Sequence, residues 1–172
     1  MEEARAFMES QETGEPPEDE TARVLKRKIA DALLACNPRL REFKIDYATI
    51  ARSQNISEEQ ARQEFTHIEL DPPDGDPAVQ IFMHNNHVAI QMPYWYTGSG
   101  ADLAFQQINQ YLRVIRSEAG YFAFDPQTDR IFNPEKETIG DHGHYERIAN
   151  DLHRIIARQL KREGKKAWWR FW

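Results

Sequence analysis

The chain has 172 residues, of which 28 are acidic and 22 basic, a net charge of -6 at pH 7 and a mean hydropathy of -0.76. This acidic balance disfavours a nucleic-acid binder, whose binding domain is usually strongly basic. The lack of a long uncharged apolar run predicts no transmembrane insertion, and the acidic start MEEARAFMES lacks the regions of a signal peptide. We therefore expect a cytoplasmic protein, and its single cysteine, Cys36, permits no internal disulfide.

Charge and composition divide the chain into three parts. Residues 1–20 are acidic and contain prolines, and a segment of this kind buries too little apolar surface to order itself, so we expect a mobile leader. Residues 21–164 carry apolar periodicity and predict a single domain. Residues 165–172, KKAWWRFW, form a basic aromatic tail whose charge is opposite to that of the leader.

The first periodic segment, residues 21–36, has apolar residues at spacings of three and four and predicts a helix. The dipeptide Asn37-Pro38 is expected to end it, because proline cannot continue the hydrogen-bonding pattern of a helix. Cys36 falls on the apolar stripe, so we predict a buried core thiol rather than a reactive one.

Two short helices are predicted between residues 46 and 65. Asp46 is a candidate N-cap for the first helix, and Ser57 with Gln60 forms a capping box for the second. The pair resembles a helix-turn-helix, in which residues 57–65 would be a DNA-recognition helix. That helix begins with two glutamates, which would face DNA phosphates, so a structural helical hairpin is favoured.

The segment AVQIFMHNNHVAIQM (78–92) predicts a β-hairpin whose two-residue loop, Asn85-Asn86, adopts a type I′ turn. In this register the apolar residues face one another on one side of the hairpin, which we expect to pack. The other face is expected to be partly open. The predicted apolar pairs are Val79–Met92, Ile81–Ile90 and Met83–Val88, and the pairs on the open face are Gln80–Gln91 and Phe82–Ala89.

Further elements complete the predicted fold. Residues 66–70 indicate another strand, and residues 101–118 an amphipathic helix that lies on the sheet and ends at Gly120. YFAFD and RIF predict two strands joined by the turn PQTD, and residues 145–164 a last amphipathic helix. The sum is an α+β fold: a two-layer sandwich with an antiparallel sheet, a β-hairpin/helix/β-hairpin unit, an N-terminal helical segment and a C-terminal amphipathic helix.

Motifs for common enzyme and cofactor classes are absent from the sequence: it contains no P-loop, dinucleotide fingerprint, nucleophile elbow or zinc-protease helix. We therefore predict no cofactor, no catalytic residue and no metal ligand. We interpret the histidines as exposed turn residues, and Asp125 and Asp129 as aspartates that bond the backbone of their own turn. The alternative is a small metal-dependent hydrolase, which would use His84, His87, Asp125, Asp129, His142 and His144.

Two aromatic clusters are the predicted binding residues. The segment MPYWYTG contributes Tyr94, Trp95 and Tyr96, which favour a binding surface but also fit rings that pack over the end of the sheet. For the tail we rank four roles. Packing on the body of the protein or self-association comes first, docking to another protein second, and contact with a membrane or a nucleic acid last. The predicted binding residues in the tail are Trp168, Trp169, Arg170, Phe171 and Trp172.

Several segments together resemble a group of bacterial proteins that share an N-P-R-L segment, a P-Y-W element after a hairpin and a D-P-Q turn before a strand. The resemblance covers residues 37–132 and implies no activity and no site residue. Small acidic proteins of this general kind are often toxin-neutralising immunity proteins. The prediction is therefore a non-catalytic cytosolic protein-binding module with an immunity or adaptor role, whose partner is another protein or a second copy.

Overall fold

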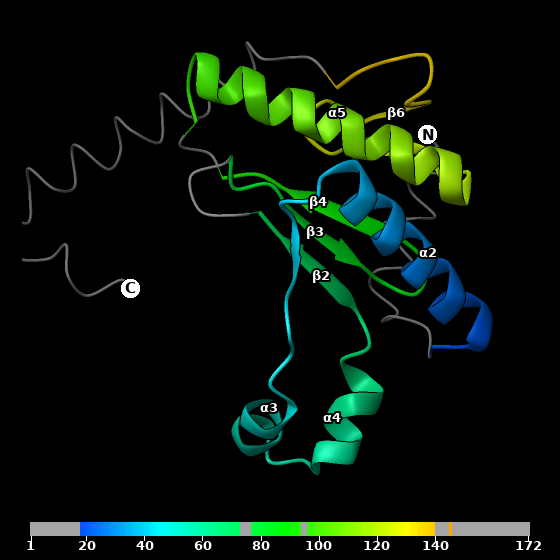
Figure 1. The fold of residues 1–172 in the computed structure, drawn as a ribbon, viewed down its shortest axis with the longest axis vertical. Helices are drawn as coiled ribbons and strands as arrows, with labels where there is room; N and C mark the ends of the chain where they lie inside the picture. The colour runs from blue at the N-terminus through cyan, green and yellow to red at the C-terminus, as the bar shows by residue number, and fades with distance from the viewer. Residues whose placement is uncertain (1–17, 73–76, 94–95, 140–144, 146–172) are drawn as a thin grey trace, which may run out of the picture.

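The computed structural model describes residues 18–72, 77–93, 96–139 and 145. The predicted mixed α+β fold is confirmed, with an antiparallel four-stranded sheet in the order β1-β2-β3-β4 and a separate two-stranded sheet, β5–β6. Figure 1 shows the elements in chain order: α2 (Glu20–Cys36), β1 (Arg41–Glu42), α3 (Tyr47–Gln54), α4 (Glu58–Glu64), β2 (Ile68–Asp71), β3 (Gln80–Met83), β4 (Val88–Gln91), α5 (Ser99–Ala119), β5 (Ala123–Asp125) and β6 (Arg130–Phe132).

Three parts of the sequence-based prediction lie outside the described residues. These are most of the acidic leader, the tail, and the last amphipathic helix apart from its first residue, Tyr145. Among the described helices, none combines the length and the apolar character needed to cross a bilayer.

The helices begin and end within two residues of their predicted bounds, and the predicted caps are joined by one that was not predicted, Asp19. The carboxylate of Asp19 accepts from the amide of Ala22 at 2.7 Å, and Asn37 ends α2. Asp46 caps α3, and the predicted capping box of α4 is present. Gly120 ends α5 at φ 72°, a left-handed conformation in which glycine carries no steric penalty.

The β3–β4 hairpin has the predicted register, but its turn type was predicted wrongly. Ile81 pairs with Ile90 and Met83 with Val88, so a two-residue loop does join the strands. Neither loop asparagine has the positive φ that a type I′ turn requires; among the described non-glycine residues only Asn55 and Asp129 do.

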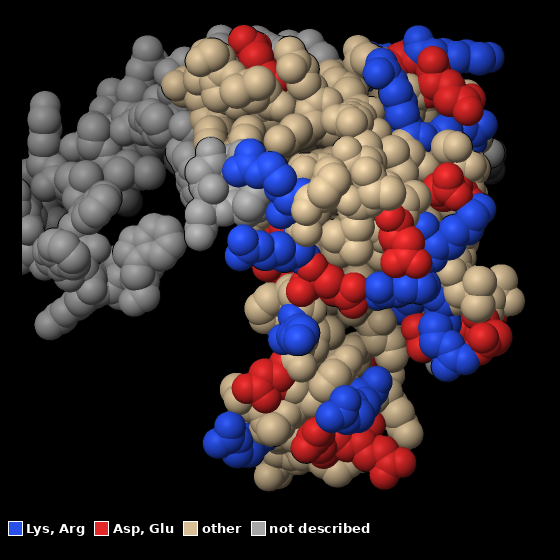
Figure 2. Space-filling model, in the orientation of Figure 1, with Lys and Arg blue, Asp and Glu red and all other residues tan. Residues whose placement is uncertain are grey.

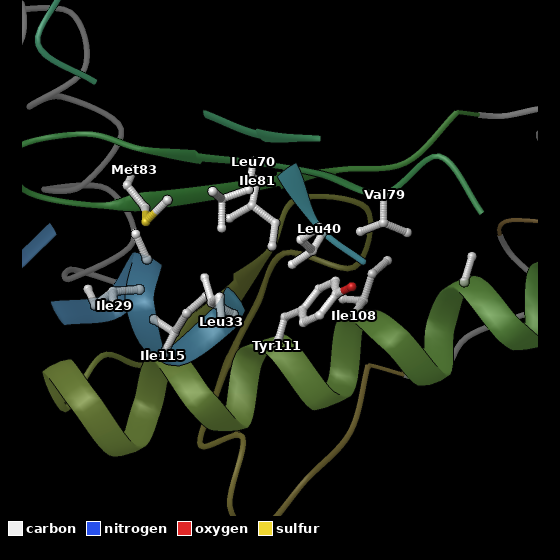
Figure 3. Packing of buried hydrophobic residues seen from close by; sticks show 12 residues of the cluster. Ile29, Leu33, Leu40, Leu70, Val79, Ile81, Met83, Ile108, Tyr111 and Ile115 are labelled. Atoms are coloured by element: carbon white, nitrogen blue, oxygen red, sulfur yellow. The ribbon is translucent and has the colours of Figure 1, made fainter. Parts of the chain in front are cut away.

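The main core lies between the sheet and the two long helices. Helices α2 and α5 lie beside each other over one face of the sheet (Figure 1), and Figure 3 shows their apolar side chains meeting those of the strands. Leu33, Leu70 and Ile81 are fully buried there. Tyr111 of α5 is also buried, and its hydroxyl accepts from the Asn37 side chain at 2.7 Å, which ties α5 to the end of α2.

The prediction of a buried Cys36 was wrong. Its side chain is only partly buried, whereas Leu33, one turn earlier on the same stripe, is completely buried. Cys36 is the last residue of α2. The apolar stripe therefore continues in the sequence to a position where the core covers the helix incompletely.

Lys26 of α2 is buried, with 3% of its surface exposed. Its ammonium group donates to the carbonyl of Thr66 and to the side-chain oxygen of Asn85, each at 2.7 Å. It also forms an ion pair with Glu18 at 2.7 Å. Three acceptors compensate for burying this charge, and together they join the start of α2, the residues before β2 and the β3–β4 turn.

Helices α3 and α4 form the predicted helical hairpin, which projects away from the sheet (Figure 1). The guanidinium of Arg62 lies 4.5 Å from the centre of the Tyr47 ring. The hydroxyl of Tyr47 donates to the carbonyl of Phe65 at 3.3 Å. These contacts hold the two helices to each other.

Candidate functional site

Strand β4 is the last strand of its sheet, and no strand lies beyond it among the described residues. The amide of His84 donates to the carbonyl of His87 at 2.9 Å, which makes these two residues a hydrogen-bonded pair. Hydrogen-bonded and non-hydrogen-bonded pairs alternate along an antiparallel ladder. The backbone N–H and C=O groups of Val88 and Ile90 therefore point away from β3.

A cavity of about 770 Å³ lies beside this strand, and we call it the β4 groove. Its walls are residues 86–92, which include β4, residues 121–128, which include β5, and four apolar side chains of α5. Residues from β6 and the segment after it complete the lining. The side chains from α5 are Phe105, Ile108, Leu112 and Ile115.

The groove explains why the two strands of the hairpin are buried to different degrees. Ile81 and Met83 of β3 are fully buried. Val88 and Ile90, their partners on β4, are only half-buried although they point to the same predicted packing face. Both line the groove, so their apolar surface is available to a molecule that enters it.

The groove is almost uncharged. Its described lining contains no lysine or arginine, and Asp125 is its only acidic residue. The Asp125 carboxylate already accepts from the amide of Gln127 at 2.9 Å and from the hydroxyl of Thr128 at 2.8 Å. Burial raises the pKa of the Tyr121 hydroxyl, which keeps that group neutral. This chemistry fits an apolar ligand and opposes an anionic one.

The predicted aromatic site is described only at Tyr96, because Tyr94 and Trp95 lie outside the described residues. The hydroxyl of Tyr96 accepts from the amide of Ala78 at 2.5 Å. Its own amide donates to the hydroxyl of Tyr145 at 3.2 Å. The ring is partly buried against the core, so this residue packs at the end of the sheet, and a binding role for it stays a prediction.

All five predicted binding residues of the tail also lie outside the described residues. Their binding role stays a prediction. The described position nearest to them in sequence, Tyr145, is fully buried and packs edge-on against Phe105, with ring centres 5.4 Å apart. Phe105 is also a groove residue, so Tyr145 lies beside the groove.

His84 and His87 lie next to each other across the turn, as the hydrolase alternative requires. Both are partly buried, so the prediction of exposed turn histidines was wrong for these two residues. The rings of His84 and His87 stack with centres 4.4 Å apart, and His67 extends the row at 5.8 Å from His84. Within the described part of the chain, no group of three or more histidine, cysteine, aspartate or glutamate residues could hold a metal ion. The other two candidate histidines, His142 and His144, lie outside that part.

The two candidate aspartates, Asp125 and Asp129, both have features that the β5–β6 turn explains. Asp125 bonds the backbone two residues later, as a turn aspartate is expected to do. Asp129 adopts φ 51°, a left-handed conformation that aspartate tolerates better than most residues. Both observations agree with the predicted turn chemistry.

The helical hairpin also bears on the DNA-binding alternative. On the face shown in Figure 2, acidic and basic side chains are interspersed over α3 and α4 and form no basic patch. Glu58, at the start of α4, pairs with Arg62 at 2.6 Å, so this cation is partly neutralised. Phosphate binding needs an excess of cations that this surface does not offer.

Comparison of the chain with protein-family models, with curated proteins and with solved structures finds no match. Any proposal for the function must therefore rest on the geometry and chemistry of the site. The sequence reasoning did not predict the β4 groove, because β4 and β5 are brought together only by the tertiary fold. The available signal was the uncharged run VAIQ in a strand that ends the sheet.

Proposed function

We propose that this chain is a non-catalytic cytosolic protein-binding module, and that its β4 groove receives an apolar segment of a partner protein. The observation that carries the proposal is the almost uncharged cavity beside the edge of β4 with which no described strand pairs. Binding sites of this kind are concave and apolar, with a few polar groups that fix orientation. An immunity or adaptor role fits such a module, because both act by protein association.

Exposed aromatic surface supports this proposal. Phe122 lines the groove and is 62% exposed, although large apolar side chains are usually covered. The guanidinium of Arg116 lies 4.5 Å from the centre of its ring and holds one face of it. Aromatic residues at the centre of interfaces carry a large share of binding energy.

The test is a selection of binders from a random peptide library displayed on phage against the full chain. Affinities of the selected peptides are then measured for the wild type, Phe122→Glu and Phe43→Glu. Phe43 is the matched control, because it is 50% exposed and lies outside the groove. We expect Phe122→Glu to weaken binding about tenfold or more and Phe43→Glu to leave it unchanged.

Equal effects of the two substitutions, or no effect of either, would overturn the assignment of the groove as the binding site. The predicted tail residues are tested in the same assay with a chain that ends at Ala167. If that version loses the peptides while Phe122→Glu retains them, the tail is the docking element and the groove is not.

A further inference from the structure

Strand β4 offers main-chain groups as well as apolar side chains to a ligand in the groove. Resting on the function proposed above, we propose that the partner segment binds as an added β-strand, hydrogen-bonded to Val88 and Ile90. The segment is an extended peptide with apolar residues at every second position and no acidic residue facing the groove. Strand addition to an exposed sheet edge is a general mode of peptide recognition.

The first argument is the direction of the backbone groups. Val88 and Ile90 have their N–H and C=O groups on the side of β4 that faces away from β3. Among the described residues, no strand pairs with that side. Alternate residues of a strand are about 6.8 Å apart. A second extended chain is the ligand that presents matching donors and acceptors at this interval.

The second argument is that β4 itself has none of the sequence features that usually protect an edge strand. Natural sheets usually guard an edge strand with charged side chains, proline, a bulge or very short length. The sequence of β4, VAIQ, contains no charge and no proline, and β4 pairs with β3 over all four residues. An edge with these properties is a ready template for pairing.

The third argument concerns the side chains of the ligand. In an added strand, successive side chains point to opposite faces. Those on the side of α5 would meet the apolar side chains of that helix, including Ile108 and Leu112. Because the described groove lining holds Asp125 and no lysine or arginine, an acidic residue there would be buried without a permanently charged partner. The ligand is therefore neutral or basic where it enters.

An apolar helix is a less suitable occupant. Its backbone groups bond within the helix, so it offers nothing to Val88 and Ile90. Those groups would then be covered by an apolar ligand without partners, which costs free energy for each one. An extended chain removes this cost.

The test uses the peptides selected against the full chain, each remade with one backbone N-methyl group at a time. Strand addition predicts that affinity falls about tenfold or more at every second position and little at the positions between. The apolar residues of the selected peptides should also alternate. This periodic pattern does not depend on any variant of the protein.

Two substitutions then locate the added strand on β4. Val88→Pro removes an N–H that points away from β3 and is expected to weaken the peptides about tenfold. Val88→Thr keeps that N–H and changes only the groove-lining side chain, so it should weaken the peptides less than Val88→Pro does, and the difference between the two variants measures the loss of the N–H. Far-UV circular dichroism of both variants checks that the fold is kept.

The remaining outcomes overturn the inference in distinguishable ways. Peptides with apolar spacing of three and four that remain sensitive to Phe122→Glu would show a bound helix, which leaves the proposed function intact. Peptides insensitive to Phe122→Glu would overturn the proposed function and the inference together. Two further results would show that the groove is occupied by this protein itself rather than by a partner. A dimer in sedimentation that Val88→Pro dissociates would make the occupant a second copy. Peptide binding that appears only when residues 168–172 are removed would make it the tail.

Discussion

The two edges of the four-stranded sheet differ in length, charge and surroundings. At one edge, β1 has only two residues, Arg41 and Glu42, which are both charged and exposed. Arg27 of α2 bonds both carboxylate oxygens of Glu42, at 2.8 and 2.9 Å. At the other edge, β4 has four uncharged residues that border an apolar groove. Strand β1 therefore has two of the features that usually protect an edge strand, charge and short length, and β4 has neither.

The largest expected effect comes from Lys26, which holds the turn of the β3–β4 hairpin against α2. Lys26→Met should lower the free energy of unfolding by about 3 kcal/mol, because it removes the ammonium group that pairs with Glu18 and donates to Thr66 and Asn85. Urea unfolding at pH 7 measures this loss. The β4 edge would then lose its fixed position, while the β1 edge keeps its bond to Arg27.

Lys28→Met is the matched control for this substitution. Lys28 is on the same helix, but its side chain is 57% exposed and pairs with Glu118 at 3.1 Å. A surface pair of this kind contributes about 0–1 kcal/mol. Equal losses for the two lysines would show that the buried contacts of Lys26 add nothing to stability.

The next effect tests which backbone groups of β4 bond to β3 and which point away from it. Ala89 pairs with Phe82 and bonds to β3, so Ala89→Pro removes a ladder hydrogen bond and should destabilise the chain by about 2 kcal/mol. Val88→Pro removes only an outward N–H and some packing, and should cost about 1 kcal/mol. Urea unfolding of both variants gives the comparison. A larger loss for Val88→Pro would reverse the assignment and refute strand addition at this edge.

The smallest effects come from two glutamates near the β1 edge, Glu42 and Glu69, whose charges should change the free energy of unfolding in opposite directions. The hydrogen bonds from Arg27 hold the pKa of Glu42 below its usual value, whereas burial, and then the charge of Asp71, raise the pKa of Glu69. A lowered pKa stabilises the fold above the unfolded-state value and loses that contribution as pH falls. A raised pKa has the opposite effect, and its contribution is lost as pH rises.

At pH 7, Glu42→Gln should therefore destabilise the chain and Glu69→Gln should stabilise it. Each change in the free energy of unfolding should be about 0.3 kcal/mol, because solvent screens both groups. Both differences should vanish when the carboxyl groups are protonated, well below the usual glutamate pKa. Urea unfolding at pH 7 and at acid pH tests this. Changes of the same sign for both variants would contradict it.

The elements that local sequence pattern determines were predicted well. The register of the β3–β4 hairpin follows from apolar alternation, because a shift by one residue would expose every apolar side chain. Caps such as Asp46 and the Ser57–Gln60 box depend on residues three positions apart. Strand β1 was not predicted, because its two charged residues have no strand pattern and pair only because β2 lies beside them.

The site was harder to predict because it depends on tertiary structure. The β4 groove combines residues near 90, 110 and 125, whose proximity no local pattern encodes. The predicted role of Asp125 as a turn residue was right, since its partners lie two and three positions away. Tyr96 was correctly named as a residue able to pack, but its bonds to Ala78 and Tyr145 cross long stretches of chain.

The position of the helical hairpin makes it replaceable. Strands β1 and β2 are antiparallel neighbours, and the amide of Phe43 donates to the carbonyl of Glu69 at 2.9 Å just beyond β1. The chain therefore leaves the sheet and returns to it at adjacent points, and α3 and α4 form the connection between two neighbouring strands. A short connection in place of residues 46–65 would shorten the chain and keep Thr66, whose carbonyl accepts from Lys26. We expect it to leave the main core and the β4 groove in place. The same junction would accept a foreign domain or a fluorescent reporter, which makes it the natural site for engineering this scaffold.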